Sequence, residues 1–359
     1  MAKESDDLHR KTYHEQIYID NTLRLRDILK TLPPFAKDYF RAIEPTTSAK
    51  TRISYAYDIR VFFHFLMDCN PVYSTYTMED FQVTDLEQLD PVDIEEYQEY
   101  LKVYHNQDEK QITNTEKGLS RKMSALRSFY GYYFKHQIIS KNPTLLVDMP
   151  KLHEKAIIRL DTDEVSSLLD YVEHGGDELT GQRKLYYEKT KNRDLAIITL
   201  LLGTGIRVSE CVGLDLQDID FKNNGIKVTR KGGNEMIVYF GEEVEHALKQ
   251  YIYTTRKSTV PLAGHENALF LSTQKKRMGV QAVENMVKKY AHEVTPNKKI
   301  TPHKLRSTYG TALYKETGDI YLVADVLGHK DVNTTKKHYA AIDENRRRQA
   351  AGAVKLREP

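Results

Sequence analysis

The residues best suited to chemistry lie near the C-terminus, where histidine, arginine and tyrosine occur within 39 residues of one another. They belong to the segments Thr301-Pro-His-Lys-Leu-Arg306, Leu327-Gly-His329 and Thr334-Thr-Lys-Lys-His-Tyr339. A further group, Gly203-Thr-Gly-Ile-Arg207-Val-Ser-Glu210, lies far upstream. Guanidinium and imidazole groups bind phosphate oxygens, and a tyrosine hydroxyl can act as a nucleophile. Together these residue types predict that a tyrosine breaks and rejoins a DNA strand without metal or ATP.

Each of these signals is weak when taken alone. His303 and Arg306 stand three apart at an expected helix start and so share one face, but exposed pairs of this kind are common. Arg207 follows a glycine turn, and Glu210 three residues later can hold its guanidinium. A surface ion pair would explain that spacing equally well. Tyr339 is one of 24 tyrosines. Only the combination of these residues favours a phosphodiester site.

A lysine stands at the tip of an expected hairpin, in Thr229-Arg-Lys231-Gly-Gly-Asn234. Lysine and glycine are ordinary turn residues, so the position alone indicates a turn. The segment also lacks the strand, GxxxxGK[ST] and helix order of a phosphate-cradling P-loop. Lys231 is therefore a candidate only as a single cation.

Composition narrows the class of protein. The 359 residues suffice for two domains, and 40% are hydrophobic, so each half can bury a core. No apolar run approaches the roughly 18 residues that span a bilayer. The N-terminus, Met-Ala-Lys-Glu-Ser-Asp-Asp, is polar and resembles no secretion signal. Because Cys69 and Cys211 are the only cysteines, we expect a reducing compartment such as the cytosol.

Charge is distributed unevenly along the chain. The net charge is only +2, but residues 1–150 carry 19 basic and 23 acidic residues, and residues 151–359 carry 34 and 28. No lysine or arginine occurs from Val61 to Leu101. Basic residues on either side of this acidic stretch suggest a DNA-binding face at Lys50, Arg52, Arg121, Lys122 and Arg127. Mixed, solvated helix surfaces are the alternative explanation.

Two domains, the first of them helical, are expected to position these candidate residues. Apolar spacing predicts helices over 53–67, 91–101 and 119–136, further helices before residue 45 broken at Pro33-Pro34, and no strand in the first half. A proline-framed segment places a domain boundary near 150–158. The expected organisation is an N-terminal helical domain over 1–150, a linker over 151–158 and a second domain over 159–359.

The second half is expected to be helical around one small antiparallel sheet. Three short strands are predicted at 219–221, 225–230 and 236–240, joined by turns rich in asparagine and glycine. The predicted helices cover 163–173, 193–203, 242–256, 280–294, 303–317, 320–327, 331–340 and 343–355. The fold class is thus mainly α with a small antiparallel β-hairpin or sheet.

The order of these elements resembles the catalytic domain of the tyrosine recombinases. Gly-Ile-Arg207 with Ser-Glu210, the Lys231 hairpin, His303-x-x-Arg306, Leu-Gly-His329 and Thr-Thr with Tyr339 occur in the family's order over residues 159–342. The segments 48–66 and 120–130 resemble two helices of the family's core-binding domain. Among subfamilies the chain looks most similar to Xer-type recombinases, particularly the XerS kind.

The resemblance implies a role for each site residue. Arg207 and Arg306 would grip the scissile phosphate, and Tyr339 would attack it to give a 3′-phosphotyrosyl bond. Lys231 would be the general acid and His303 the base or proton shuttle, although the sequence leaves open which of the two is which.

Two further residues complete the implied site. His329 would hydrogen-bond the phosphate or the leaving oxygen, and Glu210 would orient Arg207. Two departures from the family pattern are visible. Tyr339 follows His329 by ten residues where Xer proteins usually have nine, and the hairpin reads Arg-Lys-Gly-Gly instead of Gly-Lys-Gly-Asn. The second departure leaves Arg230 as an alternative to Lys231, although only lysine readily loses a proton.

The resemblance further implies a two-domain clamp on double-stranded DNA that carries paired inverted-repeat sites. The basic C-terminal tail would dock on a neighbouring protomer in a homotetramer, with no membrane, metal or other cofactor involved. Chromosome-dimer resolution is the expected role, and integration or excision of a phage or transposon is the alternative.

Other classes of protein remain open. A catalytically inactive DNA-binding protein on the same fold, a type IB topoisomerase and a metal-dependent nuclease are the competing functions. The nuclease is disfavoured because the carboxylates of residues 295–340 lack ligand-like spacing.

Overall fold

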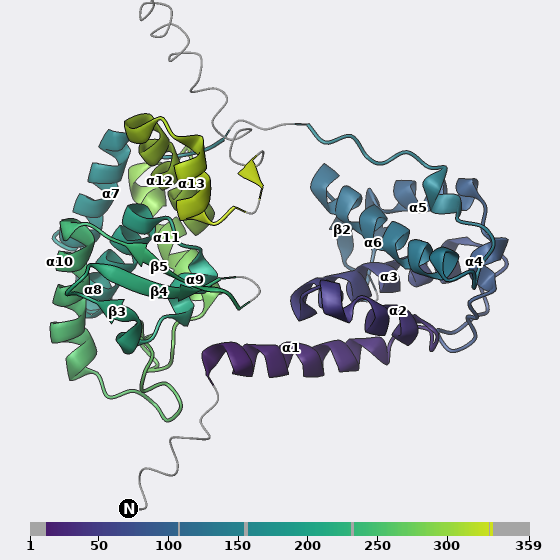
Figure 1. Ribbon diagram of the computed structural model, residues 1–359, viewed down its shortest axis with the longest axis horizontal. Helices are drawn as coiled ribbons and strands as arrows, with labels where there is room; N and C mark the ends of the chain where they lie inside the picture. Colours follow the sequence, from purple (N-terminus) through teal and green to yellow (C-terminus); the bar gives the residue numbers. More distant parts are fainter. Residues whose placement is uncertain (1–11, 107, 154–156, 231–232, 330, 333–359) are drawn as a thin grey trace, which may run out of the picture. The chain divides into compact units, whose positions relative to one another are not determined.

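The computed structural model describes residues 12–106, 108–153, 157–230, 233–329 and 331–332. The chain divides into two compact units, Met1–Lys155 and Ala156–Pro359. Helices dominate both units, and the strands form two small antiparallel sheets (Figure 1). The predicted fold class, mainly α with a small antiparallel sheet, is confirmed.

The first unit is built almost entirely from helices. In chain order they are α1 (Tyr13–Leu29), α2 (Ala36–Ala42), α3 (Ala49–Cys69), α4 (Asp85–Gln88), α5 (Pro91–Tyr100) and α6 (Glu116–Lys135), with 3-10 turns at Glu44–Thr46 and Pro143–Leu145. As predicted, the chain breaks at Pro33-Pro34, between α1 and α2. Pro91 opens α5, because proline lacks only an N–H that a first helical residue leaves unused.

An aromatic core holds these helices together. Helix α3 packs against both α1 and α6. Phe62 and Phe63 of α3 and Phe129 of α6 are fully buried, and the Phe63 and Phe129 rings meet edge to face with centroids 6.2 Å apart. Aromatic residues bury the largest area per side chain, so this core supplies much of the unit's hydrophobic stabilisation.

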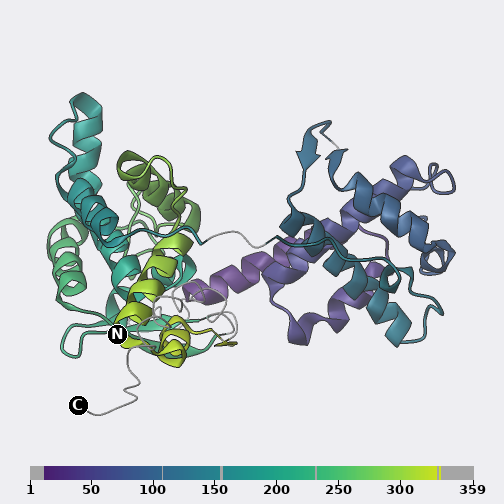
Figure 2. The same cartoon turned by 90° about the horizontal axis from the view of Figure 1, so that it is seen from above.

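The expectation of no strand in the first half is wrong. Strands β1 (Val103–His105) and β2 (Gln111–Thr113) pair antiparallel and project from the unit as a short hairpin (Figure 2). Tyr104, opposite Ile112 in this register, is the one buried residue of the pair. A single inward position on each three-residue strand gives too little alternation to be recognised in the sequence.

The second unit places a three-stranded sheet among helices. The helices are α7 (Thr162–His174), α8 (Gly181–Thr204), α9 (Val208–Gly213), α10 (Glu242–Gln250), α11 (Val280–Val294), α12 (Pro302–Thr317) and α13 (Ile320–Leu327). Strands β3 (Ile219–Asp220), β4 (Gly225–Thr229) and β5 (Glu235–Tyr239) lie in the order β3-β4-β5, as the sequence predicted. A 3-10 turn at Leu216–Asp218 leads into β3.

Helix α8 is the centre of the second unit. It packs against α7, α10 and α12, and its residues 196–201 are buried on every side of the helix. A helix that is apolar all round in this way belongs in a core. It begins earlier than predicted, because residues 181–192 are polar and give no apolar period. The segment 242–256, which was predicted as one helix, consists of two elements. Helix α10 ends at Gln250, and a π-helix follows over Tyr251–Arg256.

The last two described helices, α12 and α13, lie next to or carry candidate site residues. Helices α12 and α13 pack on each other, and α12 packs on α8 (Figure 1). The predicted helices over 331–340 and 343–355 lie outside the described residues, apart from residues 331 and 332. Among the described residues, no helix is both long and apolar enough to cross a membrane.

Candidate active site

Guanidinium groups from three separate elements converge on the turn that ends α13. This helix closes with Gly328 in the left-handed conformation, at φ 61°. The carbonyls of residues 326–328 each accept a hydrogen bond from a different arginine, one arginine following β4, one capping α9 and one within α12. The pairs are Arg230 Nη2 with Val326 at 2.7 Å, Arg207 Nη2 with Gly328 at 3.2 Å, and Arg306 Nη2 with Leu327. Carbonyls at a helix C-terminus have no intrahelical donor, so they are natural guanidinium acceptors.

Arg207 is fixed from its other side by Glu210. Arg207 caps the N-terminus of α9, and its backbone N–H donates to Glu210 Oε2 at 2.8 Å. Its Nη1 donates to Glu210 Oε1 at 2.7 Å. Glu210 is buried, whereas the Arg207 side chain is 35% exposed. The carboxylate therefore anchors the guanidinium and leaves part of it accessible to a ligand.

Arg306 is the most deeply buried of the three. It is 4% exposed and donates to the carbonyls of Gly205 and Leu327. Gly205 ends α8 with φ 62°, and a Cβ there would overlap the ring of Tyr309 from α12. The glycine that allows α8 to end here thus also allows α12 to approach it, and the gap is bridged by Arg306.

The two histidines lie at the edges of this cluster. His303 is exposed in the first turn of α12, one turn before Arg306. His329 follows the Gly328 cap, and its backbone N–H donates to the Ala324 carbonyl at 2.8 Å. The α13 C-terminus therefore positions His329 next to the carbonyls that hold the arginines.

Lys231 and Tyr339 lie outside the described residues. Arg230, just before Lys231, is described, and its backbone N–H donates to the Asn234 carbonyl at 2.7 Å. Burial lowers the pKa of the Arg230 guanidinium, and the Arg207 cation lowers it further against an opposing effect of Glu210. Arg230 thus lies close enough to Arg207 and Glu210 for both charges to act on its guanidinium.

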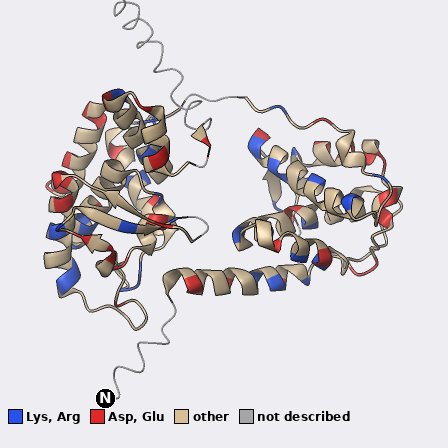
Figure 3. Ribbon diagram, in the orientation of Figure 1, with Lys and Arg blue, Asp and Glu red and all other residues tan. Residues whose placement is uncertain are grey.

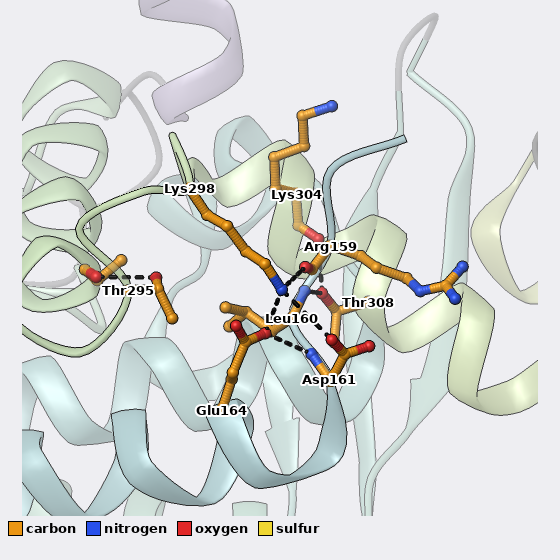
Figure 4. A network of polar contacts seen from close by, with 9 residues as sticks. Arg159, Leu160, Asp161, Glu164, Thr295, Lys298, Lys304 and Thr308 are labelled. Atoms are coloured by element: carbon orange, nitrogen blue, oxygen red, sulfur yellow. Dashed lines mark hydrogen bonds and ion pairs between the residues drawn. The ribbon is translucent and has the colours of Figure 1, made fainter. Parts of the chain in front are cut away.

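A polar network that sequence patterns did not predict stabilises the start of α12. Lys298 Nζ donates to Glu164 Oε2 at 2.6 Å, to Asp161 Oδ2 at 3.3 Å and to the Arg159 carbonyl at 3.3 Å (Figure 4). Beside it, Thr308 of α12 accepts a hydrogen bond from the backbone N–H of Leu160 at 3.0 Å. The chain that enters the second unit is thereby fastened to the helix that carries His303 and Arg306.

The predicted DNA-binding residues of the first unit have different surroundings. Lys50 is exposed near the N-terminus of α3, and Arg121 has a half-exposed side chain that pairs with Asp58. The other three are engaged within the unit. Arg52 pairs with Glu44 at 2.9 Å, Lys122 pairs with Asp58 at 3.2 Å, and Arg127 donates to the Thr144 and Val147 carbonyls. Only Lys50 and Arg121 of this set present charge at the surface.

Acidic and basic positions are also segregated along the first unit's helices. Helices α4 and α5 carry acidic residues and no basic one, whereas α3 and α6 carry lysines and arginines (Figure 3). An anionic ligand would therefore meet α3 and α6 more favourably than α4 and α5.

A separate cavity lies in the described part of the second unit. Its volume is about 630 Å³, and it is lined from α8, the π-helix and the segment 271–275. None of the predicted site residues lines it. The turn that ends α13, and not this cavity, brings the predicted site residues Arg207 and Arg306 together.

Residues 158–346 match the phage integrase family. The chain is 34% identical over 327 residues to the tyrosine recombinase XerC of Caldanaerobacter subterraneus subsp. tengcongensis, covering 89% of this chain and 86% of that one. It is 29% identical over 352 residues to the tyrosine recombinase XerS of Streptococcus equi subsp. equi, covering 90% and 96%.

Solved structures show the same fold. The Tn1549 transposon integrase in complex with transposon right end DNA superposes with a TM-score of 0.61 at 21% identity, over 89% of this chain and 99% of that one. The XerH site-specific recombinase bound to a palindromic difH substrate gives a TM-score of 0.60 at 18% identity, over 84% and 78%.

Proposed function

We propose that this chain, which belongs to the phage integrase family and is a tyrosine recombinase, uses Tyr339 to cut and rejoin duplex DNA at specific paired sites. The observation that best supports this site is the convergence of Arg207 and Arg306 on one turn beside His329. These fixed cations surround a position where a phosphate could bind. No described cluster of carboxylates, histidines or cysteines is arranged to hold a metal there.

In the proposed reaction, the Tyr339 oxygen attacks phosphorus and the bond from phosphorus to the 5′-oxygen breaks. A 3′-phosphotyrosyl bond forms, and a 5′-hydroxyl leaves with a proton. Attack by the 5′-hydroxyl of a second strand reverses these changes and releases the tyrosine. One phosphodiester is exchanged for another, so ATP is not needed.

The two arginines stabilise the charge that develops on the phosphate. Guanidinium is always charged and can donate two parallel hydrogen bonds to phosphate oxygens. Arg207 retains accessible surface for this purpose, because Glu210 and the Gly328 carbonyl hold it from other directions. Donors fixed before the reaction need no reorganisation as charge develops, which makes them effective in catalysis.

Proton transfer completes the proposed mechanism. A free tyrosine has a pKa near 10, so a base and a positive surrounding are needed to activate Tyr339. We assign Lys231 and His303 as the general acid and the base or proton shuttle, and His329 as a hydrogen-bond donor to the phosphate or leaving oxygen. His303 is exposed at the start of α12 and is accessible to a DNA strand.

The two units have separate tasks in this proposal. The first, over 1–150, binds DNA through surface charges that include Lys50 and Arg121, while Arg52, Lys122 and Arg127 stabilise its helices. After a linker over 151–158, the catalytic unit, 159–359, closes on the duplex to complete a clamp. Four copies assemble on two inverted-repeat sites, each tail docking on a neighbour.

The proposed biological role is resolution of chromosome dimers in the bacterial cytoplasm, at the nucleoid. Similarity to XerC and XerS proteins over most of the chain supports it. Integration or excision of a mobile element is the second candidate, favoured by the fold similarity to a transposon integrase.

The test is covalent capture on a nicked duplex. A binding site is first selected from a pool of random inverted repeats, and a nick is then placed beside the cleavage position so that the short fragment diffuses away. We expect wild type to give a protein–DNA adduct that survives denaturant, and Tyr339→Phe to give none. The matched control is Tyr253→Phe, at a tyrosine that is 60% exposed on the π-helix.

Four results would contradict the proposal. An adduct formed equally by Tyr339→Phe would remove Tyr339 as the nucleophile. Loss of cleavage in EDTA would replace the metal-free mechanism. Site binding by wild type without any adduct would indicate an inactive DNA-binding protein. Relaxation of a supercoiled plasmid that carries no paired sites would indicate a topoisomerase.

A further inference from the structure

Arg230 contacts the site in a way that the assigned roles do not explain. It follows β4 and lies 96 residues from Val326, whose carbonyl accepts from its Nη2 at 2.7 Å. The contact therefore joins the sheet to the C-terminus of α13. Val326, Leu327 and Gly328 each give a carbonyl to one arginine, so Arg230 holds the same turn as Arg207 and Arg306.

Arg230 can lie against position 328 because the glycine there has no side chain. A Cβ at position 328 would overlap Arg230 Nη1, so the guanidinium lies directly against the glycine. Gly328 also has φ 61°, a conformation that is costly for other residues. The glycine thus serves the backbone turn and the close approach of Arg230 together.

Burial of part of the Arg230 guanidinium carries a free-energy cost. Its Nε is buried and has no hydrogen-bond partner among the described residues. A buried donor without a partner costs free energy, so the remaining contacts of Arg230 must compensate for it. Retaining a third cation beside Arg207 under these conditions suggests a purpose beyond surface solubility.

We propose that Arg230 is a positioning residue for strand cleavage: it packs against Gly328, donates to the Val326 carbonyl and thereby sets the turn that presents His329. The same turn presents the Gly328 and Leu327 carbonyls that accept from Arg207 and Arg306. This inference rests on the proposed function. Arg230 acts through the turn and does not itself touch the phosphate. Its loss lowers the rate of cleavage while DNA binding is retained.

The kinetic test uses Arg230→Gln and Arg230→Lys in single-turnover cleavage of the nicked duplex. We expect Arg230→Gln to slow cleavage by roughly 10- to 100-fold, the loss expected for a hydrogen bond made by a charged group. DNA affinity should stay within about threefold of wild type, since the loss is in the chemical step. Arg230→Lys keeps a donor for the Val326 carbonyl and is expected to recover a large part of the rate.

The matched control is Arg256→Gln. Arg256 is also a buried arginine, 6% exposed, and donates to the Ala268 and Glu266 carbonyls away from the site. Its substitution reports the cost of removing any buried guanidinium from this unit. Equal loss of cleavage rate in both variants would overturn a specific role for Arg230.

A substrate with sulfur as the 5′-bridging atom tests how Arg230 acts. A thiolate leaves without needing a proton, so this substrate should relieve the defect of Lys231→Ala but not that of Arg230→Gln. Relief of both defects to the same extent would mean that Arg230 serves only the proton donor, and the proposed action through the α13 turn would be wrong.

Hydrogen exchange tests the same inference without any DNA. The amides of Gly328 and His329 donate to the Asp325 and Ala324 carbonyls, each at 2.8 Å. Arg230→Gln should speed exchange of both amides by about tenfold, because local opening becomes easier, and Arg256→Gln should leave them unchanged. Unchanged exchange in Arg230→Gln would contradict the inference, even if wild-type cleavage is normal. An accelerated exchange with no wild-type adduct would instead contradict the proposed function alone.

Gly328→Ala gives a second, independent variant. The new methyl group must displace Arg230, so the double variant Gly328→Ala with Arg230→Gln should lose less cleavage than the product of the two single losses. Fully multiplicative losses would show that the two residues act independently and would overturn the proposed packing of Arg230 against Gly328.

Discussion

The clustered cations of the two units differ in the groups that accept their hydrogen bonds. In the first unit, three of the predicted DNA-binding cations meet carboxylates: Arg52 pairs with Glu44, and both Arg121 and Lys122 pair with Asp58. In the second unit, three arginines meet backbone carbonyls at the end of α13, and Glu210 is the carboxylate that accepts a hydrogen bond from one of them.

This difference separates structural charge from functional charge. A carboxylate cancels the charge of its partner, whereas a carbonyl orients a guanidinium and leaves its charge available. The three arginines that the α13 carbonyls orient are therefore placed to attract an anion, and the cations paired with Asp58 are placed to hold helices together. Counting basic residues along the sequence cannot distinguish the two.

The largest effect should come from removing Arg207. We expect Arg207→Ala to lower the single-turnover cleavage rate by about 10³-fold, the scale found when one preorganised donor to a developing anion is lost. Site binding should change little, because many other phosphate contacts remain. The rate is read from adduct formation and binding from a gel shift.

A loss of binding without a change in cleavage at saturating protein would contradict this separation. It would place Arg207 among the residues that only position the DNA. Arg277 offers the matched control, since it also donates to backbone carbonyls, those of Val212 and Leu214, but also pairs with Asp215.

A smaller effect, on stability, is expected at Asp58. Burial raises the pKa of the Asp58 carboxyl, while Lys122 and Arg121 oppose this shift. Asp58→Asn would leave the buried Lys122 ammonium without its counter-charge, which typically costs about 3 kcal/mol. We expect a lower free energy of unfolding for the first unit in urea, with the chemistry of DNA-bound protein unchanged.

The control for that prediction is Asp68→Asn, a neighbouring acidic residue on the same helix that is exposed. It should change stability by at most about 0.5 kcal/mol. Similar losses in both variants would mean that the net charge of α3, and not the buried pairing, determines stability.

The sequence predicted the helices and the second sheet well because these elements have strong periodicity and clear ends. Asp161 and Glu164, for example, form a capping box at the start of α7, the first helix predicted in the second half. The β1–β2 hairpin and the π-helix were missed, since each is too short to impose a period of its own. Both depend on packing that a local pattern does not encode.

The site was predictable in its side chains but not in its backbone groups. Arg207 and Arg306 were recognised from residue types and their order. The Leu327 side chain is buried in the core, as its apolar character favours, yet its carbonyl accepts a hydrogen bond from Arg306. Every residue has a carbonyl, so nothing in the sequence marks the one that will accept a guanidinium. The same reason hides the Lys298 contact with the Arg159 carbonyl.

The smallest effect should distinguish a solvated cation from a paired one within the first unit. Lys50 is exposed, and the Glu44 and Asp58 carboxylates pair with Arg52 and Lys122, so we expect Lys50 to contact a phosphate. Lys50→Gln should weaken DNA binding modestly and reduce the slope of log affinity against log salt by about 1. Fluorescence anisotropy over a range of salt concentrations measures both quantities.

Two comparisons make the salt slope informative. Lys37→Gln removes an equal charge from an exposed position on α2 and should leave the slope unchanged if Lys50 acts by direct contact. Arg52→Gln should lower stability without changing the slope, because Arg52 already binds Glu44 at 2.9 Å. If all three substitutions reduced the slope equally, the general field of the unit would attract the DNA, and burial and pairing would not identify its contact residues.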